Sequence, residues 1–588
     1  MLKNLLLHLL RTPARLLRSR RVTPAWAGLE PAIADFNTKN YASVIARCRT
    51  ALEQEPRSAQ ANHLCGRALM ELDRHAEADT YLRAAAEADP DLAEAHADLA
   101  AVRFKAKDYA AAEAHARRAI AVQGGEIRYR LLLVDVLEAA GRGKDALAEL
   151  SMAQEYAPER LDVLVRLSQG LDRLCLYAEM LRIAERSMIE VGEKFETFLC
   201  LAVARYATND MDGAVEAARK ALTFSAEQPR VYVTLGSALF ALGRIEEALA
   251  AYKRALKLSP RYADAQFHMG LANLMRRKYR EGWQDFEERF RTAQYRDYPP
   301  CMPRWNGTSL HGRTLLIHRE QGLGDEIMYA SCFPQVIADA QHCFIECESR
   351  LEKLFARSFP RATVFSSPGN DRSIPQTIPE ADVDVRTYAA SLPRYLRNSL
   401  RDFPDHTGYL LADPERVGYW REQVATLGDG LKVGISWRGG TTLTYTGRRS
   451  LSLEALLPVL SVPGVRWVNL QYGDRAGEIA ACEGGHGIRI ADWPDAIDND
   501  YDETAALVTA LDLVISVCTS VVHLTGALGK PVWVMASYVP EWRYGLHGES
   551  MPWYPAARLI RQTERGAWEP VIAEVEQQLR KYVAQGQK

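Results

Sequence analysis

Several signatures of common protein classes are missing from this chain of 588 residues. The formal net charge of −2 leaves no excess of lysine and arginine to neutralise phosphates, so no nucleic-acid partner is expected. The ten cysteines form no C-x-x-C pair, which argues against zinc and thioredoxin-like sites and favours reduced, mostly buried thiols. No G-x-x-x-x-G-K-[ST] loop occurs, which disfavours a phosphate-loop ATPase.

Long apolar runs are also missing. Beyond the N-terminus, no stretch approaches the 18 uncharged apolar residues of a membrane-spanning helix. Residues 1–24 could place leucines on one helical face followed by arginines, without the cleavage site of a secretory signal. This segment is compatible with a basic amphipathic helix on an anionic membrane surface or with a packed or frayed extension. We therefore expect a cytoplasmic protein, with any membrane contact confined to this segment.

What the sequence does contain is a period of 34 residues between residues 25 and 296. Prolines mark the repeat boundary at positions 56, 90, 158 and 260. One series of small residues in this register comprises Gly66, Ala100, Val134, Ser168, Ala202, Gly236 and Gly270. Antiparallel helices approach closely only where side chains are small, and proline ends a helix. The pattern resembles the tetratricopeptide repeat (TPR), most closely in the segment 231–260.

About eight such units would stack into a superhelix with a concave groove. Repeats of this kind bind extended peptides or protein surfaces, and the alternative is a solenoid that only rigidifies or dimerises the protein. After a Pro-rich linker at 297–312, short apolar strands alternate with helical stretches, which is typical of α/β layers.

Strands are expected at 314–318, 343–347, 432–437, 465–471, 511–517 and 532–536. Two strand-first segments predict an N-lobe at 313–412 and a C-lobe at 430–588, with a substrate cleft at the carboxyl ends of their strands. The predicted fold class is α + α/β, a helical solenoid followed by two Rossmann-like lobes. A dinucleotide fingerprint beginning Gly322-x-Gly324 fails, because its third glycine position is Ile327.

Several motifs of the C-terminal half resemble heptosyltransferase-like glycosyltransferases of the GT-B fold. The motifs are 321–330, 434–439 with 448–451, and 512–533. The later motifs 541–544 and 552–555 resemble a bacterial subgroup with N-terminal TPRs, some members of which glycosylate flagellins in the cytoplasm. The resemblance implies a GT-B enzyme that takes a nucleotide-sugar as substrate, without cofactor or metal. It also implies a protein acceptor held by the repeats, with flagellin the leading candidate and a nonulosonic acid one candidate sugar.

The same resemblance assigns the catalytic base to Asp325. Glycosyl transfer needs a base for the acceptor proton and positive charge or N–H dipoles for the departing phosphate. In the family, a loop carboxylate of the first lobe faces the acceptor. The alternative role for Asp325 is a plain helix N-cap, and Glu326 is the nearby substitute as base.

Donor-binding residues are expected in the C-lobe. Thr519 and Ser520 lie where a strand turns into a helix, so free N–H groups and the helix dipole favour a phosphate there. His523, one turn later, could reach the same anion or serve a structural role.

Three arginines and one glutamine complete the candidate donor site. Arg438, Arg448 and Arg449 are candidates for neutralising the leaving group, with ordinary surface arginine as the alternative. Gln471, which ends its own strand, is expected to touch the nucleotide base or ribose.

One residue departs from the family pattern. Cys518 stands where the subgroup usually carries an acidic residue, which leaves donor choice or activity open. A buried neutral substitute fits this position better than a nucleophile, because inverting transfer needs no covalent enzyme intermediate. The alternatives to a protein-glycosylating enzyme are a transferase acting on a lipid-linked glycan and a non-enzymatic TPR adaptor with a decayed transferase domain.

Overall fold

The computed structural model describes residues 28–292, 295, 302–366, 383–439, 449–498 and 500–586. The chain divides into two compact units, Met1–Asp210 and Met211–Lys588. The segment 1–24 and Arg448, which carry sequence predictions, lie outside the described residues. No helix in the described ranges is both long enough and apolar enough to cross a membrane.

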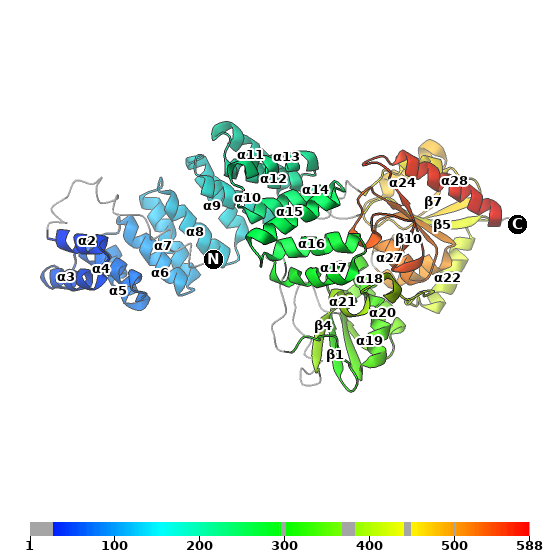
Figure 1. Cartoon of the computed structure of the whole chain (residues 1–588), viewed down its shortest axis with the longest axis horizontal. Coiled ribbons are helices and arrows are strands. Elements are labelled where there is room, and N and C mark those ends of the chain that lie inside the picture. Colours follow the sequence, from blue (N-terminus) through cyan, green and yellow to red (C-terminus); the bar gives the residue numbers. More distant parts are fainter. Residues whose placement is uncertain are drawn as a thin grey trace. The chain divides into compact units, whose positions relative to one another are not determined.

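The first unit consists of short helices joined in pairs by tight turns (Figure 1). They are α2 (Glu30–Asn37), α3 (Tyr41–Gln54), α4 (Ala59–Glu71), α5 (His75–Ala88), α6 (Ala93–Lys105), α7 (Tyr109–Val122), α8 (Ile127–Ala139), α9 (Gly143–Tyr156), α10 (Leu161–Arg173), α11 (Tyr177–Glu190) and α12 (Phe195–Ala207). The second unit opens with further helices of the same kind. These are α13 (Met211–Phe224), α14 (Pro229–Ala241), α15 (Ile245–Leu258), α16 (Ala263–Met275) and α17 (Tyr279–Phe286), followed by the 3-10 helix η3 (Glu287–Arg291).

Close packing explains the series of small residues. A Cβ atom added to Gly66 would lie 2.6 Å from Leu82 Cγ, and one added to Gly236 would lie 2.5 Å from Tyr252 Cε1. At Gly270 the nearest atom would be the backbone nitrogen of Phe286, at 2.7 Å. Helices of one pair therefore touch where the sequence provides almost no side chain, and the predicted reason for the period is confirmed.

The turn inside each pair has a second regularity, which lies in its backbone conformation. One residue per turn adopts the left-handed backbone conformation, with φ between +56° and +78°. These residues are Lys39, Asp73, Lys107, Gly141, Cys175, Asn209, Gly243 and Arg277. They recur every 34 residues, yet only two of them are glycine, the residue that adopts this conformation without steric cost. Glycine spacing therefore does not reveal the turn.

The N-lobe is a four-stranded parallel sheet with the order β3-β2-β1-β4. Its elements are β1 (Thr314–His318), α18 (Leu323–Ala330), α19 (Phe333–Asp339), β2 (His342–Cys347), η4 (Ser349–Leu351), α20 (Glu352–Ser358), β3 (Thr363–Ser366), β4 (Val385–Tyr388), η6 (Ala389–Ser391), α21 (Pro393–Leu396) and η7 (Leu400–Asp402). Strand β1 is fully as predicted, and helix α18 begins at Leu323.

The C-lobe sheet has the order β10-β11-β9-β8-β5-β6-β7 and is parallel except for the β10–β11 pair. Its elements are α22 (Pro414–Ala425), β5 (Leu431–Ser436), η10 (Glu454–Leu456), α23 (Leu457–Leu460), β6 (Val465–Asn469), α24 (Ala476–His486), β7 (Ile490–Ala491), α25 (Pro494–Asp498), α26 (Tyr501–Ala510), β8 (Leu513–Val517), α27 (Ser520–Ala527), β9 (Val532–Ala536), η11 (Trp542–Tyr544), β10 (Ser550–Met551), β11 (Tyr554–Arg561) and α28 (Glu569–Gly586). In Figure 1, α24 and α28 lie above these strands and α27 and α22 below them.

The segment 413–429, which lies between the two predicted lobes, contains helix α22. Asp413 caps this helix by accepting hydrogen bonds from the backbone of residues 415 and 416. Arg416 and Trp420 of α22 both donate to Glu503 of α26, so the helix packs as part of the C-lobe. The predicted class, a TPR solenoid followed by an α/β region with parallel sheets, is confirmed.

The last repeat is built into the α/β region of the second unit. Trp283 of α17 packs edge-on against Trp542, with ring centroids 5.2 Å apart, and its indole N–H donates to the carbonyl of Arg397 at 2.9 Å. Trp553 of the C-lobe in turn packs on Phe403, which follows η7, at 4.9 Å. This aromatic cluster therefore joins the end of the repeats to both lobes.

Candidate functional site

The glycine loop after β1 places Asp325 in the first turn of α18. Gln321 has φ +69°, which turns the chain sharply before the helix begins. The backbone N–H of Gly322 donates to Asp325 Oδ2 at 3.3 Å. Asp325 is therefore not the N-cap residue of the helix; from the third helical position, one of its carboxylate oxygens accepts from the backbone of the N-cap, Gly322, and the other oxygen is engaged elsewhere.

The loop meets the C-lobe at the start of α27. A Cβ atom added to Gly324 would lie 2.9 Å from His523 Cδ2 and 3.3 Å from Ser520 Cα. The lobes thus approach closely at a position where the sequence places a glycine. Tyr409, in the segment 403–413 between η7 and α22, contacts both sides. Its hydroxyl donates to the carbonyl of Ile327 in α18, and its N–H donates to the carbonyl of Ala527 in α27.

Arg543 of η11 supplies the partner of Asp325 across the lobes. Its Nη2 lies 2.6 Å from Asp325 Oδ1, and the two side chains are only 14% and 17% exposed. Its Nη1 lies 3.5 Å from Nε2 of His523. Arg543 was not among the predicted site residues, and the motif 541–544 is the sequence signal that points to it.

His523 is buried in the first turn of α27. Its Nδ1 lies 3.0 Å from the hydroxyl of Tyr554. Burial, together with the positive charges of Arg543 and Arg449, lowers the pKa of His523 well below its usual range. His523 is therefore a neutral imidazole at physiological pH and contributes hydrogen bonding rather than charge.

Thr519 and Ser520 stand at the N-terminus of α27, as predicted. Thr519 is the N-cap, and its hydroxyl accepts from the backbone N–H of Val521 at 3.2 Å. The Ser520 hydroxyl accepts from the hydroxyl of Tyr501 at 2.6 Å. Both hydroxyls thus have protein partners, and the Thr519 cap fixes the direction of the helix axis and its dipole.

Arg449 forms the second arginine–carboxylate pair of this region. Its partner is Glu541, which directly precedes η11. Burial lowers the pKa of Arg449. Cys518 itself is buried, and burial raises the pKa of its thiol to about 11. Cys518 is therefore a neutral thiol, which is the state that the sequence analysis favoured.

Arg438 and Gln471 lie beyond the ends of β5 and β6, at the same carboxyl edge of the sheet as Thr519. Arg438 pairs with Glu478 at 3.0 Å and donates to the carbonyl of Asp474. Gln471 Oε1 accepts from the backbone N–H groups of Trp437 and Arg438 at 3.1 and 2.8 Å. The Gln471 side chain therefore shapes the loop after β5, a use that its position in the sequence did not suggest.

The glycine loop is also tied to the end of the repeats. Arg289 of η3 is fully buried and donates from Nε and Nη2 to the two oxygens of Glu320, at 2.5 and 2.9 Å. The same guanidinium donates to Glu287 and to the hydroxyl of Ser391. Because Glu320 precedes Gln321, this network holds the turn that presents Asp325.

Glu326, the substitute candidate for the base, points into the N-lobe. It is buried and accepts a hydrogen bond from the backbone N–H of Glu348 at 2.8 Å. Burial raises the pKa of Glu326 to about 8. Its partners make it part of the connection between α18 and the end of β2.

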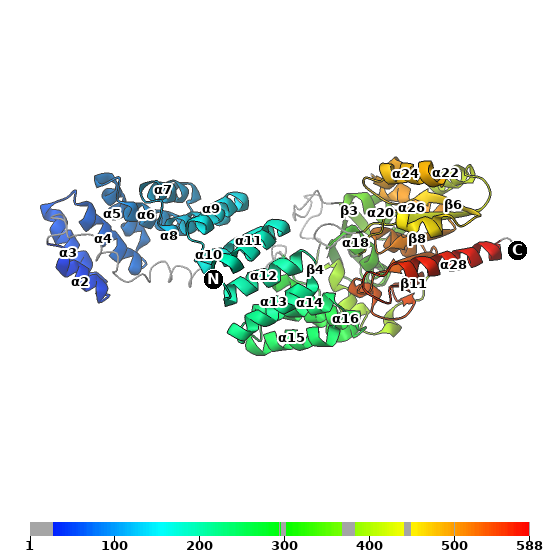
Figure 2. The same ribbon diagram turned by 90° about the horizontal axis from the view of Figure 1, so that it is seen from above.

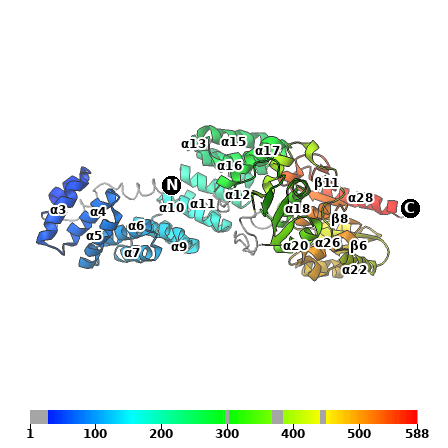
Figure 3. The same ribbon diagram turned by 90° about the horizontal axis from the view of Figure 1, so that it is seen from below.

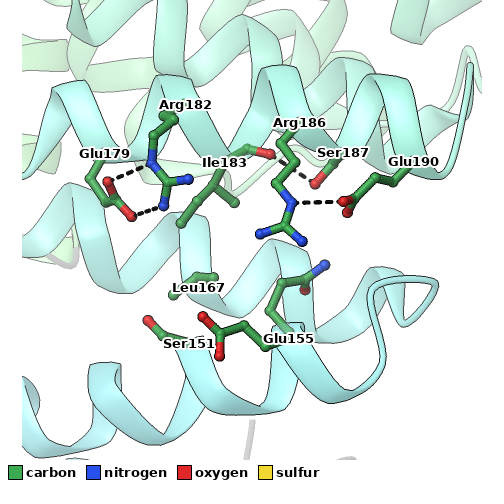
Figure 4. A pocket seen from close by; sticks show the side chains of 10 residues that line it. Ser151, Glu155, Leu167, Glu179, Arg182, Ile183, Arg186, Ser187 and Glu190 are labelled. Atoms are coloured by element: carbon green, nitrogen blue, oxygen red, sulfur yellow. Dashed lines mark hydrogen bonds and ion pairs between the residues drawn. The ribbon is translucent and has the colours of Figure 1, made fainter.

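A separate hollow lies in the first unit, between α9 and α11 (Figure 4). Arg182 and Arg186 line it from α11, each paired with a glutamate of its own helix, Glu179 and Glu190. Glu155 of α9 lines the opposite side. Within the described ranges, no group of three or more His, Cys, Asp or Glu residues could hold a metal ion.

Comparison with known proteins places the chain in a family. Family models for "TPR repeat" and "Tetratricopeptide repeat" match residues 236–275 and 59–92. Protein FlbA of Caulobacter vibrioides is 30% identical over 586 residues, which cover 95% of this chain and 96% of that protein. The chain belongs to the FlbA family.

Other similarities of this FlbA-family protein cover parts of the chain. The peroxisomal targeting signal receptor of Eremothecium gossypii is 30% identical over 126 residues, or 21% of each chain. The crystal structure of YrrB, "a TPR protein with an unusual peptide-binding site", matches with 16% identity and a TM-score of 0.26, over 37% of this chain and 95% of that one. The family matches at 236–275 and 59–92 confirm the predicted TPR repeats, and repeats of this kind typically bind peptides or protein segments.

Proposed function

We propose that this FlbA-family protein is a GT-B glycosyltransferase that moves a sugar from a nucleotide-sugar donor to Ser or Thr of a protein acceptor. One observation carries the proposal. A carboxylate of the N-lobe, Asp325, contacts Arg543 of the C-lobe, and the same guanidinium lies beside His523 in the first turn of α27. A carboxylate base on one side and an anion site on the other are what glycosyl transfer from a nucleotide requires.

The proposed step is a displacement at the anomeric carbon of the donor sugar. The acceptor hydroxyl oxygen forms the new bond to that carbon, and its proton passes to Asp325. The bond from the anomeric carbon to the donor phosphate breaks, and the nucleotide leaves with the electron pair. Arg543, Arg449 and the N-terminus of α27 stabilise the negative charge on the departing phosphate. No metal or cofactor takes part in this scheme.

The repeats are proposed to hold the acceptor, with flagellin as the leading candidate. The TPR architecture and the motifs shared with TPR-bearing glycosyltransferases support this part of the proposal. The packing of Trp283 and Arg289 against the lobes supports it further, because it fixes the last repeat beside the glycine loop. A protein segment bound along the last repeats would therefore be delivered close to Asp325.

The test is co-expression of the full chain with a candidate flagellin, followed by intact-mass measurement of the flagellin. Wild type should add the mass of one or more sugars. Asp325→Asn keeps the volume and the acceptor oxygen that caps α18, and it should lower transfer by about 10²–10⁴-fold, the usual contribution of a general base. Asp405→Asn, at an exposed position between η7 and α22, is the matched control and should transfer sugar as wild type does.

The other outcomes distinguish the alternatives. Labelled sugar in lipid extracts, with unmodified flagellin, would favour transfer to a lipid-linked glycan. No modification of protein or lipid by wild type, while flagellin still binds the chain, would favour a non-enzymatic adaptor. Equal transfer by wild type and Asp325→Asn would remove Asp325 from the role of base.

A further inference from the structure

Arg543, the cation that contacts Asp325, belongs to the opposite lobe and has a further N–H group for a second partner. Arg543 reaches Asp325 Oδ1 with Nη2 at 2.6 Å. Its Nε is buried and donates no hydrogen bond to any residue that the structure describes. A guanidinium carries five N–H donors in a fork that matches carboxylate and phosphate alike. The contact with Asp325 therefore uses only part of what Arg543 offers.

The surroundings of Arg543 favour an anion. Its Nη1 lies 3.5 Å from Nε2 of His523, in the first turn of α27, where backbone N–H groups and the helix dipole attract negative charge. Arg449, the neighbouring cation, is already paired with Glu541. A donor phosphate at the start of α27 would therefore compete with Asp325 for Arg543.

We propose that Arg543 exchanges partners during the reaction. It pairs with Asp325 while the donor site is empty and binds the donor phosphate once the donor enters, which releases Asp325 to accept the proton of the acceptor hydroxyl. This inference rests on the proposed function. It adds Arg543 to the residues that contact the donor, and it makes the base available only when a phosphate is in place.

The exchange predicts an unusual effect of the base variant on binding. Asp325→Asn removes the carboxylate that competes with the phosphate, so it should bind the nucleotide more tightly while it fails to transfer sugar. Because the two anions share one cation, the gain should depend on Arg543 and vanish when that residue is replaced. A structural role of Arg543 alone predicts no such gain.

The experiment is isothermal titration of the full chain with inorganic pyrophosphate, CMP, UDP, GDP and ADP. For the probe that wild type binds best, Asp325→Asn should lower Kd about tenfold, a typical size for coupling between two ligands of one site. Arg543→Gln should raise Kd about tenfold, and Arg543→Lys, which keeps the charge, should lie between. The double variant Asp325→Asn/Arg543→Gln should match Arg543→Gln. Melting curves of each variant check that it is folded.

A matched control separates the exchange from simple loosening of the lobes. Arg357 of α20 pairs with Asp502 of α26 at 2.6 Å, and Figures 2 and 3 show these two helices side by side. Asp502→Asn therefore also removes a carboxylate from an arginine pair between the lobes, and it should leave Kd unchanged. An equal gain with Asp502→Asn, or a gain that persists without Arg543, would overturn the exchange.

Failure of the exchange and failure of the proposed function give different results. If wild type transfers sugar but Asp325→Asn binds the probes no more tightly, the exchange is refuted and the transferase function stands. If Asp325→Asn gains affinity for pyrophosphate but wild type transfers no sugar to any acceptor, Arg543 binds anions as proposed and the transferase function is refuted. If wild type binds none of the five probes, the exchange is refuted.

Discussion

Replacement of Arg289 by methionine should destabilise the second unit strongly, because it leaves a buried carboxylate without its cation. Arg289 is fully buried and Glu320 is 6% exposed, so water cannot take the place of the guanidinium. Breaking a buried, hydrogen-bonded ion pair by removing one partner costs about 3–5 kcal/mol. Arg289→Met/Glu320→Gln removes the unpaired charge and should recover a substantial part of that loss.

The assay is urea unfolding of the full chain followed by tryptophan fluorescence, because Trp283 lies in the aromatic cluster next to this network. Hydrogen exchange of α17 and of the glycine loop locates the effect. The matched control is Arg291→Met in the same 3-10 helix, whose partner Glu288 is partly exposed and whose loss should cost less than about 1 kcal/mol. A cost for Arg289→Met as small as the control's, or no recovery in the double variant, would refute the reasoning.

Three further changes have defined outcomes. Lys107→Gly should stabilise the first unit by about 0.5–1 kcal/mol, because glycine adopts the left-handed conformation of this turn without steric cost. Ala106→Gly, at a neighbouring residue in right-handed conformation, should destabilise the unit by a similar amount. The melting temperatures of the two variants test this difference in sign. Burial raises the folded-state pKa of Glu326 to about 8, so the stability that the protonated Glu326 contributes is lost as pH rises from about 4.5 to 8. The melting temperature of Glu326→Gln should therefore rise relative to that of wild type across this pH window. A difference in melting temperature that stays constant with pH would contradict burial as the cause. Gly324→Ala would place a Cβ 2.9 Å from His523 Cδ2, so it should lower sugar transfer in the intact-mass assay, and full activity would show that the lobes need not approach so closely.

The repeats were predictable because helix packing requires a small residue at fixed positions of each repeat. Gly66 and Gly236 mark places where two helices touch, and their spacing is visible without any knowledge of the fold. The turns between the helices were not predictable in the same way. Lys107 and Cys175 adopt the left-handed conformation that glycine favours, because the flanking helices determine the turn whichever residue occupies it.

The candidate site was predictable to the extent that it is local. Asp325, Ser520 and His523 each follow a strand–loop–helix pattern, and the structure brings these segments together at the interface of the lobes. Arg543 comes from a short 3-10 helix with no periodicity of its own, so only the tertiary fold reveals its contact with Asp325. Arg289 and Glu320 likewise meet across an expected domain boundary, which local patterns do not report.

The position of the unit boundary at Asp210/Met211 has a practical consequence for hybrid proteins. A splice after residue 296, where the repeats were expected to stop, would transplant α17 and η3 away from the lobes and sever Trp283 and Arg289 from the surfaces that they anchor. A splice after Asp210 carries those anchors along with the α/β lobes. Exchange of the N-terminal repeats between relatives should therefore be attempted at the earlier junction, where helices α13 to α17 stay with the lobes.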